Sequence, residues 1–186
     1  MNDRWKPPMT NNKSSNEKFK ENSNAHLVIN ITQQTLTLYQ HHKEITQYTV
    51  STAKNGIGSQ QDSGCTPLGK HFIAEKIGAG EPMNAVFVGR TPTGEVYYAE
   101  LGKRHPERDW ILSRILWLSG LEEGCNKGSN SQGDCDTYQR YIYIHGTPDT
   151  EPMGVPLSHG CIRMRNVDMI ELFAQIEEGA PVHVIA

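Results

Sequence analysis

The run Arg140-Tyr141-Ile142-Tyr143-Ile144-His145-Gly146 alternates ring-bearing side chains with isoleucines. Because successive side chains of a β-strand point to opposite faces, the alternation predicts a strand with Tyr141, Tyr143 and His145 on one face. The glycine ends the run, so the strand carries a histidine at its end beside two phenols. A turn-rich, proline-containing connection over 147–156 then returns the chain to a second notable segment that begins near Leu157.

Strand-like runs separated by turn residues fill much of the remaining chain. The first three predict an antiparallel meander, and the last one closes the C-terminus. The runs are 27–31, 35–40, 45–52, 70–75, 85–89, a weaker one at 96–99, and 181–185.

Two segments show helical spacing of their apolar residues instead. The first predicts a short helix over 110–118, and we expect 110–139 to form a helical and loop insertion that caps a cleft; the alternative is a helix packed on a sheet edge. The second follows Asn166 as an N-cap and closes at Gly179. The residues that carry the two patterns are Trp110, Ile111, Ile115 and Leu118, then Met169, Leu172, Phe173 and Ile176. We expect a mainly β, sandwich-like fold with two or so short helices.

Composition limits the domain organisation and the class of partner. Residues 1–25 are rich in Asn, Lys, Ser and Glu, which predicts a disordered polar tail, and 26–186 then form one domain. A net charge of −3 with both signs dispersed disfavours nucleic acid. No apolar run approaches roughly 18 residues, so no membrane span is expected. The N-terminal residues lack a signal-peptide core, which predicts a cytoplasmic protein.

Four cysteines are present, at positions 65, 125, 135 and 161. In a cytoplasmic chain of this length, reduced thiols are the expectation. A Cys125–Cys135 bridge across the glycine-rich loop is the alternative.

The segment Ser158-His159-Gly160-Cys161-Ile162-Arg163-Met164 combines a thiol, an imidazole, a glycine and a fixed cation. A free thiol is only a few per cent ionised at neutral pH, so a catalytic cysteine needs a base to take its proton. His145 and His159 are the two available imidazoles, and the residues alone do not choose between them. The combination indicates nucleophilic catalysis by Cys161.

The residues beside Cys161 suit the rest of such a reaction. Gly160 allows a close backbone approach, with the N–H groups of Gly160 and Cys161 facing a developing oxyanion. Arg163 is a planar double donor that fits a carboxylate, which indicates an anionic substrate. A closed zinc site of His145, His159, Cys161 and His183 is the alternative, but it leaves the arginine without a role.

The motifs resemble the signature of the YkuD-type L,D-transpeptidase catalytic domain. The resemblance is carried by His145-Gly146-Thr147-Pro148, by Ser158 to Met164 with Asn166, by Thr66-Pro67-Leu68-Gly69 and by Val50-Ser51-Thr52. It covers roughly residues 26–186. It implies a mostly β fold with the thiol in a cleft under a cap, and no cofactor or metal.

The resemblance also implies a role for each residue. Cys161 is the nucleophile, acylated as D-Ala leaves a peptidoglycan tetrapeptide or muropeptide at its bond to meso-diaminopimelate. His145 is the general base, its second ring nitrogen held by a backbone carbonyl such as that of Gly146. His159 lines the site beside the oxyanion, which Gly160 and Cys161 bind. The substrate-binding residues are Arg163, Ser158 and Tyr143, with Arg163 holding a stem-peptide carboxylate.

The acyl acceptor is the open question. For a cytoplasmic chain, we expect water, which makes the protein an L,D-carboxypeptidase of peptidoglycan recycling. One alternative is a periplasmic transpeptidase that forms crosslinks or exchanges D-amino acids, and another is a non-catalytic peptidoglycan-fragment binder. Reaction with a carbapenem, an acylating agent that the resemblance suggests, separates the binder from an enzyme.

Overall fold

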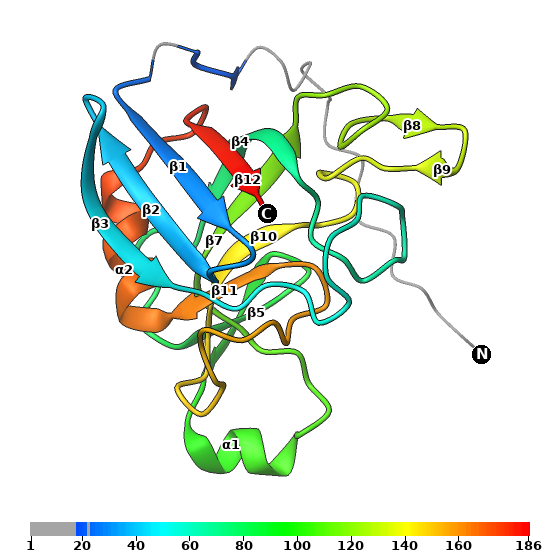
Figure 1. Cartoon of the computed structure of the whole chain (residues 1–186). Helices are drawn as coiled ribbons and strands as arrows, with labels where there is room; N and C mark the ends of the chain where they lie inside the picture. The colour runs from blue at the N-terminus through cyan, green and yellow to red at the C-terminus, as the bar shows by residue number, and fades with distance from the viewer. Residues whose placement is uncertain (1–17, 22) are drawn as a thin grey trace.

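A ten-stranded mixed sheet forms most of the molecule (Figure 1). The computed structural model describes residues 18–21 and 23–186, so most of the predicted N-terminal tail lies outside the described residues. The strands of the main sheet are β1 (Ala25–Asn30), β2 (Thr35–Gln40), β3 (Lys43–Thr49), β4 (Gly69–Ile77), β5 (Ala85–Val88), β6 (Thr91–Val96), β7 (Ile111–Gly120), β10 (Tyr143–Thr147), β11 (Ile162–Arg165) and β12 (Pro181–Ile185). Strands β8 (Ser129–Asn130) and β9 (Gly133–Asp134) pair separately, and the helices are α1 (Ala99–Arg104) and α2 (Asn166–Gln175).

The strand order is β11-β10-β7-β4-β12-β1-β2-β3, and the β5–β6 hairpin also pairs with β7. Strands β1, β2 and β3 form the antiparallel meander that the sequence predicts. The C-terminal strand β12 lies between β1 and β4, parallel to β1, with Leu27 opposite Val182. The expected mainly β fold with two short helices is confirmed.

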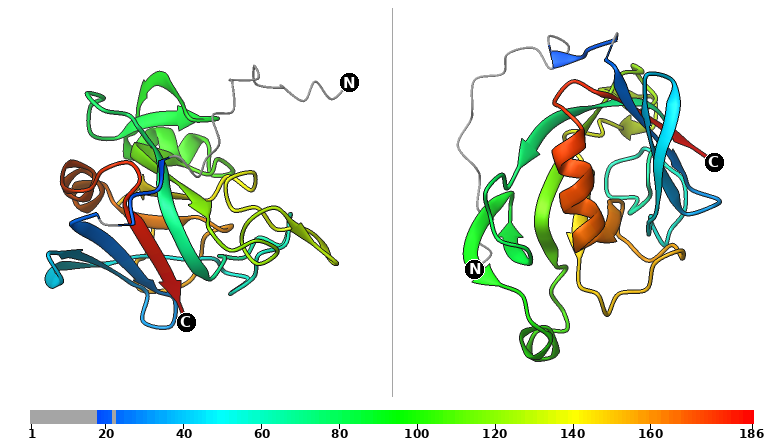
Figure 2. Two further views of the ribbon diagram at one scale, coloured as in Figure 1. Left: turned by 90° about the horizontal axis from the view of Figure 1, so that it is seen from above. Right: turned by 90° about the vertical axis from the view of Figure 1, so that its left-hand side faces the viewer.

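Helix α2 packs against β7, β10 and β11, on the concave side of the curled sheet (Figure 2). Its apolar face, Met169, Leu172 and Phe173, is buried as predicted. These residues join one core cluster with side chains from β1 and β2, such as Leu27 and Leu36, which are fully buried. The core therefore lies between the helix and the meander.

The predicted helix over 110–118 is wrong, because this segment is the central strand β7. β7 pairs with β4 and then with β5 along one edge and with β10 along the other, and nearly all its residues are buried. A strand buried on both faces is apolar throughout, so periodicity cannot distinguish it from a buried helix. Ser113 adds an irregularity, with a left-handed φ of 64°.

Three smaller differences concern element ends. Residues 96–99 are not a strand, because β6 ends at Val96 and α1 begins at Ala99. Strand β10 begins at Tyr143, since Tyr141 has a left-handed φ of 58°. Asn166 is the first residue of α2 rather than its N-cap; its side chain instead accepts from Ser113 Oγ and donates to the Thr147 carbonyl.

Two further expectations concern the cysteines and the helices in the described part of the chain. All four cysteines are free, and the Cys135 thiol is buried and donates to the Gly128 carbonyl. Neither described helix combines the length and apolar character that crossing a bilayer requires.

Candidate active site

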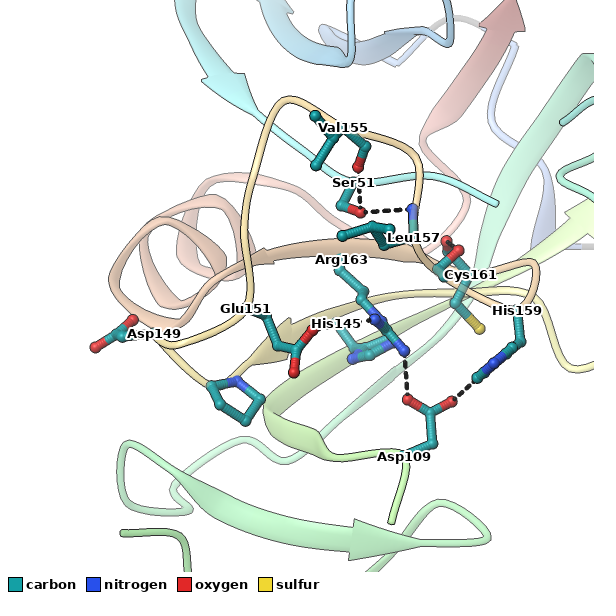
Figure 3. Close-up of polar contacts among 12 residues, drawn as sticks. Ser51, Asp109, His145, Asp149, Glu151, Val155, Leu157, His159, Cys161 and Arg163 are labelled. Atoms are coloured by element: carbon teal, nitrogen blue, oxygen red, sulfur yellow. Dashed lines mark hydrogen bonds and ion pairs between the residues drawn. The ribbon is translucent and has the colours of Figure 1, made fainter. Parts of the chain in front are cut away.

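Parallel pairing of β10 with β11 brings the two predicted catalytic segments together. His145 lies opposite Arg163 in this register, and Cys161 immediately precedes β11. In Figure 3 the Cys161 sulfur and the rings of His145 and His159 lie on the side of the loop that faces Asp109. Residues more than a dozen positions apart in the sequence thus form one cluster at the edge of the sheet.

The Cys161 sulfur is held by the backbone that leads into β10. It accepts from the Tyr143 N–H at 3.4 Å and donates to the Tyr141 carbonyl at 3.4 Å. Among the described residues neither imidazole hydrogen-bonds the sulfur. Burial raises the pKa of the Cys161 thiol to about 12, and the charge of Asp109 adds to the rise. Cys161 is therefore a neutral thiol in this state.

The His145 ring is buried and oriented by its own strand. Its Nδ1 donates to the Gly146 carbonyl at 2.8 Å, which leaves the Nε2 as the basic nitrogen. Burial lowers the pKa of His145, whereas the Asp109 carboxylate opposes that shift. His145 is thus a neutral imidazole that can accept a proton at Nε2.

Gly146 has a steric reason to be glycine. A Cβ at this position would collide with the Asn166 Oδ1 and with the Leu112 carbonyl. The close approach lets the Asn166 side chain tie β10 to β7 beside the His145 ring.

Hydrogen bonds within the loop before Cys161 fix its conformation. Ser158 is buried, and its hydroxyl donates to the Cys161 carbonyl and accepts from the Gly160 N–H. Gly160 has a left-handed φ of 134°, and its carbonyl accepts from the buried Thr66 hydroxyl at 2.9 Å. The Gly160 N–H, expected to face an oxyanion, is therefore engaged. The Cys161 N–H has no acceptor among the residues that the structure describes.

Asp109 is the site residue that sequence reasoning missed. Its Oδ1 accepts from Arg163 Nη2 at 2.7 Å, and its Oδ2 lies 3.5 Å from His159 Nδ1 (Figure 3). Burial acts to raise the pKa of Asp109, but the proximity of the His145 ring, the charge of Arg163 and the hydrogen bonds from His159 and Arg163 outweigh it and lower the pKa. Asp109 lies more than 30 positions from the nearest motif residue, so no local pattern could have identified it.

The remaining predicted residues differ in exposure. Arg163 is only 8% exposed and has a second carboxylate, Glu151, at 3.6 Å. The His159 side chain is 78% exposed. Tyr143 is buried, and its hydroxyl accepts from Arg90 at 3.1 Å. Its contact with the sulfur is made by its backbone N–H.

A pocket of about 200 Å³ opens beside these groups. Its lining includes Asp109, Trp110, Glu151, His159 and Arg163. Both signs of charge line the walls, and the wall residues come from the segment before β7 and from the two catalytic segments. The lining residues His159 and Arg163 flank Cys161 in sequence, so the pocket can receive part of a peptide beside the Cys161 loop, although Cys161 and His145 are not themselves lining residues.

The described side-chain clusters do not support the zinc site that was the alternative to thiol catalysis. Within 18–21 and 23–186, no group of three or more His, Cys, Asp or Glu side chains is arranged to hold a metal ion. His183, the fourth ligand of the zinc alternative, is an exposed residue of β12.

The amino-acid sequence of this chain matches one protein family. Residues 24–184 match the model of the YkuD family, described as the L,D-transpeptidase catalytic domain. No curated protein matches the chain.

Solved structures share the fold at low sequence identity. The L,D-transpeptidase from Mycobacterium smegmatis has a TM-score of 0.52 at 17% identity, over 88% of this chain and 59% of that one. An L,D-transpeptidase in complex with imipenem has a TM-score of 0.52 at 18% identity, over 88% of this chain and 59% of that one. The Bdellovibrio bacteriovorus protein Bd1075 has a TM-score of 0.54 at 17% identity, over 90% of this chain and 51% of that one. This chain therefore spans between half and three-fifths of these structures.

Proposed function

Because the chain belongs to the YkuD family of L,D-transpeptidase catalytic domains, we propose that it cleaves peptidoglycan tetrapeptides between meso-diaminopimelate and D-Ala through a Cys161 thioester. The observation that carries the proposal is the β10–β11 pairing, which puts the thiol of Cys161 and the buried His145 in one cluster. The free Cys161 N–H and the adjoining pocket supply the other parts that thiol acyl transfer requires.

In the first half-reaction the Cys161 Sγ attacks the carbonyl carbon of diaminopimelate while its proton moves to His145 Nε2. The carbonyl oxygen becomes an oxyanion, and the Cys161 N–H donates to it. When the intermediate collapses, the C–N bond breaks and His145 returns the proton to the amine of the departing D-Ala. The acyl group remains on sulfur as a thioester.

In the second half-reaction we propose that water is the acceptor, which makes the protein an L,D-carboxypeptidase of peptidoglycan recycling in the cytoplasm. His145 removes a proton from the water, the new C–O bond forms, and the thiol leaves with that proton. Once it holds part of the donor, a pocket of about 200 Å³ has little room for a second stem peptide, since sites that enclose drug-sized ligands hold roughly 300–1,000 Å³.

The rival reaction transfers the acyl group to an amine. Glu107, Asp109 and Glu151 line the pocket, and these carboxylates favour a cationic acceptor. Crosslinked dimers or exchanged D-amino acids are the products of this reaction.

Product analysis tests both reactions. Purified protein is incubated with defined tetrapeptide, alone or with added D-amino acid, and products are identified by mass spectrometry. Tripeptide and free D-Ala in water support the proposal, whereas dominant dimer or exchange product overturns the choice of water. Cys161→Ala is the control and releases nothing.

Imipenem, the compound bound in one structurally similar L,D-transpeptidase, tests for a catalytically silent binder. An enzyme forms a covalent adduct on Cys161, and intact protein without an adduct overturns the proposed thiol chemistry. Fractionation of the native cells, with detection of this chain, tests the cytoplasmic location separately.

A further inference from the structure

Arg90 contacts the two tyrosines whose backbone holds the Cys161 sulfur, and it has no carboxylate partner among the described residues. Arg90 occupies the turn of the β5–β6 hairpin, where Val88 pairs with Thr91. Gly89 and Arg90 both have left-handed φ angles, 54° and 71°. Two-residue hairpin turns of this form need positive φ at both positions, which is unfavourable for an arginine. The backbone there thus holds Arg90 in an uncommon conformation that directs its side chain toward β7 and the start of β10.

The guanidinium is held by aromatic rings. Its central carbon lies 4.4 Å from the ring centre of Trp117 and 4.8 Å from that of Tyr141. Nη1 donates to the Tyr143 hydroxyl at 3.1 Å. Stacking of this kind fixes the plane of the guanidinium without using its N–H donors.

Most of those donors remain available. A guanidinium has five N–H groups, and within the described chain the Tyr143 hydroxyl is the acceptor that Arg90 contacts. The other arginines near the site differ: Arg163 pairs with Asp109 and Glu151, and Arg108 pairs with Glu95. Arg140 uses its donors on the Gly58 and Cys65 carbonyls and the Ser63 hydroxyl. Arg90 is therefore a pre-oriented cation whose charge is not neutralised by the protein.

The same tyrosines connect Arg90 to the nucleophile. The Tyr143 backbone N–H and the Tyr141 carbonyl hold the Cys161 sulfur, and the side chains of both residues hold Arg90. Tyr141 is 44% exposed and Cys161 is half-buried, so solvent reaches both residues. The sulfur and the guanidinium thus contact the same two tyrosines, one through their backbone and the other through their side chains.

We propose that Arg90 binds a free carboxylate of the acyl donor, the contact that the sequence motif implies for Arg163. The proposal rests on the function proposed above. A tetrapeptide donor offers carboxylates on the diaminopimelate side chain and at the C-terminal D-Ala, and a planar guanidinium can bind either through two parallel N–H···O bonds. Arg163 instead orients Asp109 and the loop around Cys161.

Kinetics with three substrates test the proposal: the tetrapeptide, its form amidated at the diaminopimelate side chain, and its form amidated at the D-Ala carboxyl. We expect the wild-type protein to prefer the free tetrapeptide over one amidated form by roughly tenfold to a hundredfold in kcat/KM, the range for a charge-assisted contact. The amidated substrate with the lower kcat/KM identifies the carboxylate that Arg90 binds. Arg90→Gln removes that preference by raising KM for the free tetrapeptide, with kcat little changed.

Matched variants separate binding from packing. Arg90→Lys keeps the charge but not the two-pronged geometry, and retains part of the preference. Arg104→Gln is the matched control, because Arg104 likewise contacts a tyrosine, Tyr98. Arg104 lies in α1, which contributes no residue to the pocket lining. This variant keeps the wild-type preference.

The outcomes are distinct. An active Arg90→Gln protein that keeps the wild-type ratios for both amidated substrates overturns the role of Arg90. A wild-type protein that releases D-Ala from none of the substrates overturns the proposed function itself. If Arg90→Gln fails to fold, judged by thermal unfolding, Arg90→Lys decides: unchanged ratios overturn the proposal and reduced ratios support it.

Discussion

Arg163 donates to the Asp109 carboxylate at 2.7 Å, across 54 positions of sequence. The pair joins the segment before β7 to the strand that follows the nucleophile. Because the Arg163 side chain is only 10% exposed, its charge needs this partner, and the Asp109 charge in turn acts on His145 and Cys161. One carboxylate thus influences the base and the thiol together.

Replacing Asp109 with Asn keeps the shape of the side chain and removes its charge. The carboxylate raises the pKa of His145, so its loss lowers that pKa further and moves the acid limb of the activity profile to lower pH. It also raises the pKa of Cys161, so thiolate forms at lower pH in the variant. The pH dependence of D-Ala release and of iodoacetamide alkylation measures both shifts.

Glu95→Gln is the matched control for Asp109→Asn. It removes a carboxylate of the β5–β6 hairpin that pairs with Arg108, and Glu95 itself is not one of the residues that line the pocket. The profile of this variant stays that of the wild type. Wild-type profiles in Asp109→Asn would show that the charge of Asp109 does not reach the reacting groups.

Alkylation of Cys161 is expected to be slow at neutral pH. Burial raises the pKa of the thiol to about 12, and the His145 pKa is lowered, so the pair rests as thiol and imidazole rather than as an ion pair. The rate of modification by iodoacetamide, resolved by peptide mapping, rises with pH well into the alkaline range. The exposed Cys125 serves as the internal reference. A rate that is already maximal at pH 7 contradicts a neutral resting pair.

Thr66 is expected to act as a positioning residue for the Cys161 loop. Its buried hydroxyl donates to the Gly160 carbonyl at 2.9 Å and accepts from the Ala53 N–H at 3.0 Å. Thr66→Val leaves both groups unsatisfied and costs about 1–3 kcal/mol of unfolding free energy. Because the Gly160 backbone loses its anchor, kcat falls more than KM rises.

Thr66→Ser keeps the hydroxyl and restores kcat, which distinguishes positioning from simple packing. Chemical denaturation and steady-state kinetics of the two variants provide the measurements. Equal kcat in the Val and Ser variants would remove the positioning role.

His71 is expected to make stability depend on pH. Burial lowers the pKa of His71 to about 4, and the ring lies between the Gly69 carbonyl and the Thr137 hydroxyl. The unfolded chain, with a pKa of 6.5, binds the proton more readily, so stability is complete above that value and falls as pH decreases toward 4. The shift of the His71 pKa corresponds to about 3 kcal/mol of unfolding free energy. The pKa of buried His145 is also lowered, which adds to the loss of stability at acidic pH.

Thermal unfolding between pH 7 and pH 4 measures this loss. His71→Gln flattens the dependence, because the group that gains a proton on unfolding is absent. His105→Gln, at an exposed surface pair with Glu107, leaves the slope unchanged. An identical slope in all three proteins would assign the acid sensitivity elsewhere.

The sequence predicts the outer strands and the catalytic segments because each has a local pattern. Strand β1 carries a short apolar run, β2 alternates apolar and polar residues, and α2 presents apolar residues at helical spacing. The Cys161 segment combines residue types that rarely occur together. These features depend on neighbours a few positions away.

The features that sequence reasoning missed depend on distant contacts. Strand β7 is buried by β4, β10 and β5, so its apolar run has no distinguishing period. Asp109 and Arg90 reach the site only because β7 pairs with β10 along one edge and with the β5–β6 hairpin along the other. The Gly160 N–H was expected to be free, but the Ser158 hydroxyl accepts from it once the loop folds.

The protonated state of Cys161 bears on how the protein withstands oxidants. Peroxide attacks thiolates and reacts slowly with neutral thiols, so low-pKa cysteines are the ones converted to sulfenic acid. A sulfur that ionises only as it attacks a bound peptide escapes that damage between turnovers. The burial that makes the resting nucleophile weak therefore preserves it in its reduced, usable form.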